Sequence, residues 1–128
     1  MILLLDTSTP ICRLTFIDGD WHQDYQWESN RELAKGLLRY LDDKLKLASK
    51  TWADISALGV FEGPGSFTGL RIGITVLNTI ADAQGVPIVG GRGDDWQAIV
   101  LSKLNAGKNE KIVLPFYGGE ANITVPRK

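Results

Sequence analysis

The sequence predicts an α/β domain built on a mixed β-sheet. Three short strand-like segments joined by tight turns open the chain, which favours an antiparallel meander. After them, helix-length segments with apolar residues three and four apart alternate with short apolar strands. Strands that first form a meander and then alternate with helices are typical of α/β folds.

The meander is predicted from the first 29 residues. Residues 1–9, MILLLDTST, combine a wholly apolar strand with a polar turn. Residues 11–18 alternate loosely and place Cys12, Leu14 and Phe16 on one face. The Asp18-Gly19 turn leads into a third strand, whose aromatic residues share one face.

A helix is predicted next, capped by Ser29 or Asn30, with Glu32 placed for a capping box. It ends near Ser49, and its apolar residues form one stripe. Those residues are Leu33, Leu37, Leu41, Leu45 and Ala48, with Leu38 beside them.

The second half of the chain alternates strands and helices. Residues 57–61 predict a buried strand parallel to the first, and residues 66–83 predict a second helix stopped by Gly85 and Pro87. A strand at 87–91 and a third helix, capped by Asp94 or Asp95 and ending near Leu104, follow. We therefore expect one domain over residues 1–104, then a linker and a C-terminal β-hairpin over 105–128, turning at Gly118-Gly119.

Composition excludes several classes of function. The 128 residues are 44% hydrophobic and carry a formal net charge of -1, so bulk electrostatics does not favour nucleic acid. Cys12 is the single cysteine, which excludes a disulfide framework within the chain and favours a reducing cytoplasm. No apolar run is long enough for a membrane span, and no metal-ligand spacing is present. We expect a cytoplasmic protein that uses no metal and no cofactor.

The loop GPGS at residues 63–66 is the first candidate site. Its glycines and proline predict a tight turn, Ser66 is placed to cap the following helix, and Thr68 adds a hydroxyl. The N-terminus of a helix is suited to an anion, yet no Lys-Ser or Lys-Thr pair follows, as a Walker A loop requires. A phosphate site and a plain strand-to-helix turn both remain open.

Two further features are candidate binding sites. Gly69 and Gly73 expose a strip of helix backbone that another element can approach closely, and Arg71 is placed to pair with a partner's carboxylate or to stay solvated. The turn at 6–9 offers a carboxylate and three hydroxyls, which suit a phosphate or a magnesium ion, or local capping of the turn. The residues of that turn are Asp6, Thr7, Ser8 and Thr9.

Three stretches resemble the TsaB (YeaZ) family, a subunit of the bacterial machinery that makes threonylcarbamoyladenosine on tRNA. They are ILLLDTST, GVFEGPGSFTGLRIGITVLNTIA and GVPIVG, and the resemblance covers about the first ninety residues. It implies an actin-like, ribonuclease-H-like fold. In that fold class a turn such as residues 6–9 contacts nucleotide phosphate, which makes this turn a candidate vestigial phosphate site.

The resemblance also implies a non-catalytic role. A TsaB-like subunit binds and supports TsaD in a system that includes the ATPase TsaE, forms a homodimer when alone, and meets tRNA only through the complex. The family associates through its first two helices, which implies a set of partner-binding residues here. They are Leu33, Leu37, Leu41, Ser66, Phe67, Thr68, Gly69, Arg71, Ile72, Gly73 and Val76.

The sequence departs from the family in two places. The family has a His and a hydroxyl residue near the start of the first helix, where this chain has Leu33 and Ala34. Family members continue into a second lobe whose entry is usually Asp-Ala-Arg; here residues 115–117 are Pro-Phe-Tyr, although Glu120 remains. We therefore expect a short form that lacks most of that lobe and catalyses nothing alone.

Two alternative functions remain. A nucleotide-using enzyme of the actin-like ATPase class would cradle phosphate with the turn at 6–9 and the loop at 63–66. A peptidase-like relative of TsaD would need a metal pair or an activated nucleophile. The second alternative has little support, because the chain holds one histidine and one cysteine.

Overall fold

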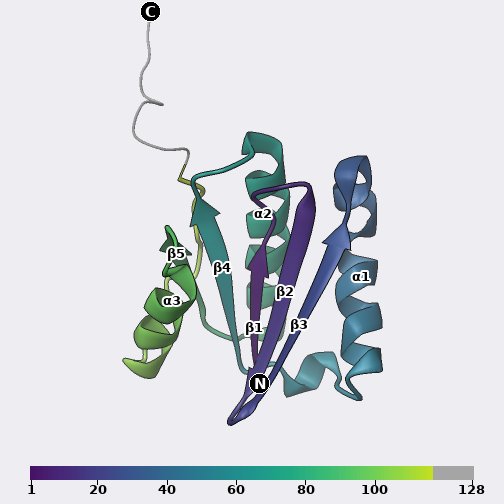
Figure 1. The fold of residues 1–128 in the computed structure, drawn as a ribbon. Helices are drawn as coiled ribbons and strands as arrows, with labels where there is room; N and C mark the ends of the chain where they lie inside the picture. Colours follow the sequence, from purple (N-terminus) through teal and green to yellow (C-terminus); the bar gives the residue numbers. More distant parts are fainter. Residues whose placement is uncertain (117–128) are drawn as a thin grey trace, which may run out of the picture.

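The computed structural model describes residues 1–116 and confirms an α/β fold on a mixed, five-stranded sheet of order β3-β2-β1-β4-β5 (Figure 1). The first three strands form the predicted antiparallel meander, and β4 and β5 run parallel to β1. The strands are β1 (Ile2–Asp6), β2 (Ile11–Asp18), β3 (Trp21–Glu28), β4 (Ala57–Gly63) and β5 (Ile88–Arg92). The helices are α1 (Leu33–Leu47), α2 (Phe67–Gln84) and α3 (Trp96–Asn105), with short 3-10 turns η1 (Asn30–Glu32) and η2 (Trp52–Asp54).

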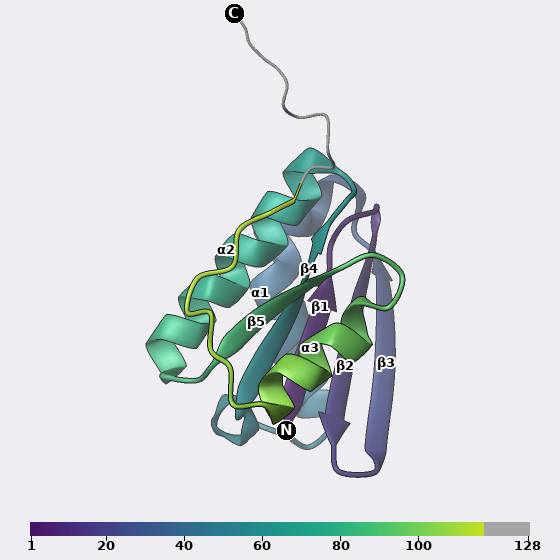
Figure 2. The same ribbon diagram turned by 90° about the vertical axis from the view of Figure 1, so that its left-hand side faces the viewer.

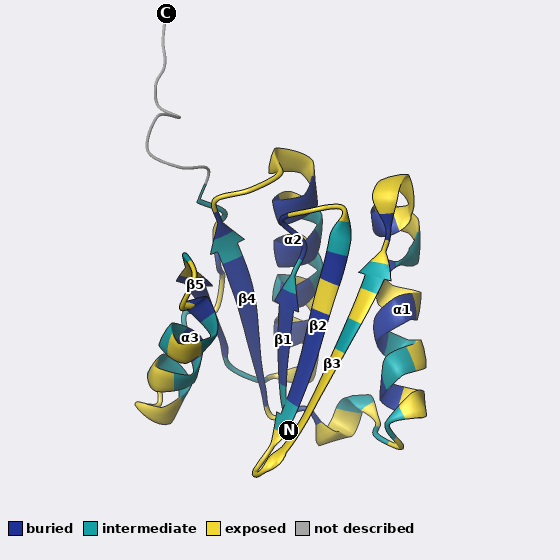
Figure 3. Cartoon of the chain, in the orientation of Figure 1, coloured by how far each residue is buried: buried dark blue, intermediate teal, exposed yellow. Residues whose placement is uncertain are grey.

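Helices cover both faces of the sheet. Helices α1 and α2 lie side by side on one face, and α3 lies on the other, over β4 and β5 (Figures 1 and 2). The leucine stripe predicted for α1 belongs to the core, where Leu37 and Leu41 are fully buried. Figure 3 shows buried and exposed stretches alternating along this helix. On the opposite face Gly59 lets Val100 of α3 lie directly against the sheet.

The start of α1 differs from the prediction. Ser29 is buried, and its hydroxyl donates to the carbonyl of Pro10 instead of capping the helix. Asn30 adopts a left-handed φ of 49° and opens the 3-10 turn η1, so α1 begins at Leu33 without a side-chain cap. The predicted capping box is therefore wrong, because a tertiary hydrogen bond has taken the serine.

The segment after α3 also differs from the prediction. Residues 109–116, here called the return segment, run back along β5 and α2 (Figure 2), and residues 111–116 form no strand. The side chain of Asn78 in α2 holds Val113 by two hydrogen bonds of 2.9 Å, one to its N–H and one to its carbonyl. The first arm of the predicted hairpin is therefore absent, while its turn at Gly118-Gly119 lies outside the described residues. The domain boundary near residue 104 stays a prediction.

Candidate helix-pair binding surface

The turn after β1 is locked onto the first turns of α2. The hydroxyl of Thr7 donates to the carbonyl of Gly69 at 2.6 Å, and Thr7 is almost fully buried. A Cβ added at Gly69 or Gly73 would overlap Thr7. The glycine strip does admit the close approach that its spacing predicts, but the element that approaches belongs to this chain. Both glycines are buried, and the strip is filled by Thr7 of the same chain.

The remaining groups of the turn at 6–9 are also used locally. The N–H of Ser8 donates to Asp6 Oδ1 at 2.9 Å, and the carbonyl of Ser8 accepts from the N–H of Ser66 at 2.8 Å. Thr9 Oγ1 contacts the backbone of Ile11. The local-capping interpretation is confirmed for these groups, and a vestigial phosphate site stays a prediction.

Ser66 is the one predicted helix cap that forms as expected. Its Oγ accepts from the N–H of Gly69 at 3.4 Å, at the N-terminus of α2. At the start of α3, Asp95 holds the capping position but makes no side-chain capping hydrogen bond. The loop at 63–66 thus acts as a strand-to-helix turn that fixes α2 against β1.

The candidate partner-binding leucines of α1 lie inside the fold. Leu33 is 5% exposed, and Leu37 and Leu41 are 0% exposed. They contribute to the core between α1, α2 and the sheet. The interpretation of Leu37 and Leu41 as direct contacts is therefore wrong, because an apolar stripe at helical spacing faces the nearest apolar surface, which here is the sheet. Leu33 also lines a hollow on the outward side of the helices, so its contact with a partner stays a prediction.

The outward side of the two helices carries a groove along their seam, here called the α1–α2 groove. Its three adjoining hollows share lining residues: Thr75 and Val76 join the first to the second, and Ala34, Thr68 and Ile72 join the second to the third. Seven of the predicted contacts line this groove, while exposed Phe67 lies beside it. They are Leu33, Ser66, Thr68, Gly69, Arg71, Ile72 and Val76.

Several lining residues were missed by sequence reasoning. Leu38 of α1 is 57% exposed and lines the hollow at the C-terminal end of α2, a space of about 360 Å³. Its position just beside the leucine stripe was the signal that could have found it. The other residues of that hollow are Trp52, Thr75, Val76, Thr79, Ile80, Ala83 and Gln84.

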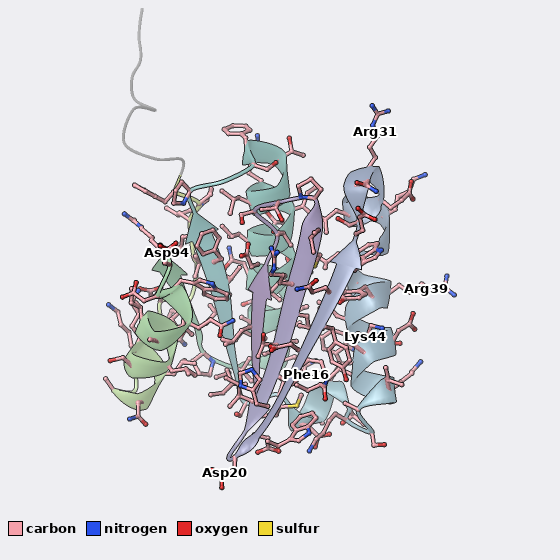
Figure 4. The ribbon with its side chains drawn as sticks, viewed as in Figure 1. Phe16, Asp20, Arg31, Arg39, Lys44 and Asp94 are labelled. Atoms are coloured by element: carbon pink, nitrogen blue, oxygen red, sulfur yellow. The ribbon has the colours of Figure 1, made fainter. Side chains whose placement is uncertain are left out.

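Charged groups border the groove rather than fill it. The indole N–H of Trp52 donates to Asp42 Oδ1 at 3.1 Å, which fixes the ring at the groove's end. The guanidinium of Arg71 lies 5.1 Å from the ring centre of Phe67. Arg31 and Arg39 point away from the body of the molecule on the outer side of η1 and α1 (Figure 4). The seam therefore presents a mainly apolar strip with a polar rim, the usual anatomy of a protein–protein contact.

The remaining reactive side chains form no further centre in the described part of the chain. Cys12 is fully buried, and burial, with a smaller contribution from Asp6, raises the pKa of its thiol to about 12. His22 lies 3.2 Å from Asp24 on the exposed third strand. Residues 1–116 contain no group of three or more His, Cys, Asp or Glu side chains able to hold a metal.

Comparison with known proteins identifies the family. The profile of the family described as TsaD, tRNA N6-adenosine threonylcarbamoyltransferase, matches residues 27–119. This chain belongs to the TsaD family. The Escherichia coli tRNA threonylcarbamoyladenosine biosynthesis protein TsaB is 34% identical over 90 residues, and its Haemophilus influenzae counterpart 28% over 88. The predicted resemblance to TsaB is confirmed.

Solved structures agree with this placement within the TsaD family. YeaZ from Pseudomonas aeruginosa superposes with a TM-score of 0.67 at 31% identity, over 71% of this chain and 43% of that one. The predicted actin-like, ribonuclease-H-like fold is confirmed. The match to E. coli TsaB spans 70% of this chain and 38% of TsaB, so the chain spans well under half of these relatives. Among the described residues, no helix is long and apolar enough to cross a membrane.

Proposed function

We propose that this chain is a non-catalytic, TsaB-like subunit of tRNA threonylcarbamoyladenosine biosynthesis that binds a TsaD-type partner through the α1–α2 groove. The observation that carries the proposal is the groove itself. Its mainly apolar surface includes Leu38, a side chain 57% exposed to water, beside the hollow formed with Val76 and Ile80. Exposed apolar surface of this kind, rimmed by polar groups, marks interaction sites.

The family supports the identity of the partner. Matches to both TsaB and the threonylcarbamoyltransferase itself support a role for this chain in that modification. A partner helix pair laid along the seam would bury Leu38, Ile72 and Val76 at once. Helices packed in this way associate through ridges set into grooves.

The α1–α2 groove also suits a homodimer, and the complex with TsaD accounts for the expected links to TsaE and tRNA. In the absence of a TsaD-type partner, two copies of the chain would pair through their grooves as a homodimer. TsaE would join only the assembled complex, and tRNA would be met through that complex. The lack of catalysis is supported by the turn at 6–9, where the Thr7 hydroxyl is buried in a hydrogen bond with α2.

The test is light scattering on the chain, alone and mixed with TsaD from the same source. We expect a discrete complex with TsaD, and Leu38→Asp weakens it by about thirtyfold or more, the effect of losing a central apolar anchor. The matched control is Leu47→Asp, because Leu47 is also an exposed leucine of α1 but lines none of the groove's hollows.

Unchanged binding by both variants would show that the interface does not lie at the α1–α2 groove. If the chain forms no complex with TsaD, the proposed partner is wrong.

A further inference from the structure

The outer edge of β5 is covered by the return segment and by Lys103 of α3 rather than by another strand. The N–H of Ile88 donates to Asn109 Oδ1 at 3.1 Å, and the carbonyl of Ile88 accepts from the N–H of Glu110 at 2.9 Å. Two residues of the return segment thus satisfy both backbone groups that β5 presents at its start.

The two backbone groups of Gly90, two residues further along β5, are also hydrogen-bonded, in this case by side chains. Its N–H donates to Glu110 Oε1 at 2.8 Å, and its carbonyl accepts from Lys103 Nζ at 2.6 Å. Lys103 also pairs with Glu110 Oε2 at 3.0 Å, so α3 and the return segment hold each other in place. Residues 88 and 90 are the pair a sixth strand would contact, because backbone groups on one side of a strand repeat every second residue.

An uncovered edge at this position would be prone to pairing. Exposed strand edges act as templates for strands of other chains, and proteins commonly block them with charges or with covering segments. Gly90 and Gly91 lack side chains that could obstruct a neighbouring strand. A second copy of this chain brings an identical β5, so it is the partner that is always available.

We propose that Asn109, Glu110 and Lys103 form an edge lock that prevents β5 from pairing with β5 of a second copy of this chain. When the lock is removed, two copies join their sheets edge to edge. This association is separate from the α1–α2 groove, since it uses backbone groups of β5 and leaves both helices free.

The experiment compares oligomeric state and amide hydrogen exchange in the Asn109→Ala/Glu110→Ala double variant. Every protein carries Leu38→Asp, so that association through the helices does not contribute. In dilute solution we expect exchange at Ile88 and Gly90 to be faster by about tenfold or more than in the parent. At high concentration the double variant doubles in mass, and both amides become protected again.

Lys108→Gln is the matched control, because Lys108 approaches the same carboxylate at 3.7 Å, while the β5 contacts come from other side chains. It is expected to match the parent in both measurements. If the double variant fails to fold, Asn109→Ala alone is measured by hydrogen exchange, since Asn109 is exposed and its loss frees only the N–H of Ile88 on β5. Faster exchange at Ile88 with unchanged exchange at Gly90 supports the edge lock, and unchanged exchange at Ile88 overturns it. A double variant that folds and keeps the parent's mass at every concentration also overturns the edge lock.

Discussion

At the scale of single residues, Thr7 occupies the space that a side chain at position 73 would need. We expect Gly73→Ala to lower the free energy of unfolding by about 1–3 kcal/mol, the usual cost of overpacking a filled core. Urea unfolding of parent and variant measures the loss.

A double-mutant cycle identifies the cause. In a Thr7→Ala background the penalty of Gly73→Ala is expected to shrink, because the overlapping hydroxyl and methyl are gone. An equal penalty in both backgrounds would show that Thr7 is not the obstacle. The larger substitution Gly73→Leu is therefore expected to disturb the fold itself.

Glu110 makes stability depend on pH. Burial raises the pKa of its carboxyl, but the Gly90 N–H, Lys103 and Lys108 together outweigh it, so the pKa lies below its ordinary 4.5. A carboxyl with a lowered folded pKa stabilises the fold above its ordinary pKa, and that stabilisation is lost as pH falls through the folded value.

The corresponding measurement is unfolding of the parent and Glu110→Gln between pH 7 and pH 3. The parent is expected to be the more stable at pH 7, and the difference is expected to shrink toward the acid end. A difference that stays constant or grows toward acid would contradict the assignment of this carboxylate to the lock.

Residue patterns predicted interactions between neighbours in the sequence better than they predicted contacts with residues far away along the chain. The cap at Ser66 follows from its position after a Gly-Pro-Gly turn, and the structure contains it. The cap at Ser29 fails because Pro10, nineteen residues away along the chain, takes the hydroxyl. Spacing likewise predicted that the Gly69–Gly73 strip admits a close neighbour, but nothing in the sequence pairs that strip with Thr7.

At the scale of elements, the return segment is held to α2 by one side chain. Asn78→Ala removes both hydrogen bonds to Val113, a residue only 2% exposed, and leaves its backbone groups unsatisfied. We expect a loss of about 1–3 kcal/mol in the free energy of unfolding. Thr79→Ala is the control, because the Thr79 hydroxyl bonds only within α2. Equal losses in the two variants would contradict a clamping role.

Elements with strong periodicity were predicted correctly, as were the short apolar strands β1, β4 and β5, whereas the first arm of the C-terminal hairpin was not. The stripe of α1 and the alternation of β2 each match the buried face that the structure shows. Residues 111–116 combine apolar residues with a nearby Gly-Gly pair, which is typical of a hairpin, but in the fold their backbone bonds to Asn78 and Glu62 instead. The Asn78 side chain and the Glu62 carbonyl, both far away along the chain, bind these backbone groups. Hydrophobic periodicity does not reveal such contacts.

At the scale of the whole molecule, the sheet separates two kinds of surface. One face supports α1 and α2 with their groove, and the other supports α3 near the locked edge of β5 (Figure 2). The family resemblance pointed to the first two helices as the contact. Of the residues it implied, Ile72 and Val76 line the outward groove, Leu37 and Leu41 are buried, and Leu38, which it did not include, lines the groove as well.

Amide hydrogen exchange of the chain, free and mixed with TsaD from the same source, tests the central claim most directly. Bound TsaD is expected to slow exchange along α1 and α2, around Leu38 and Val76, and to leave α3 unchanged. Protection confined to α3, or to the open face of β2 and β3, would contradict the α1–α2 groove as the binding surface.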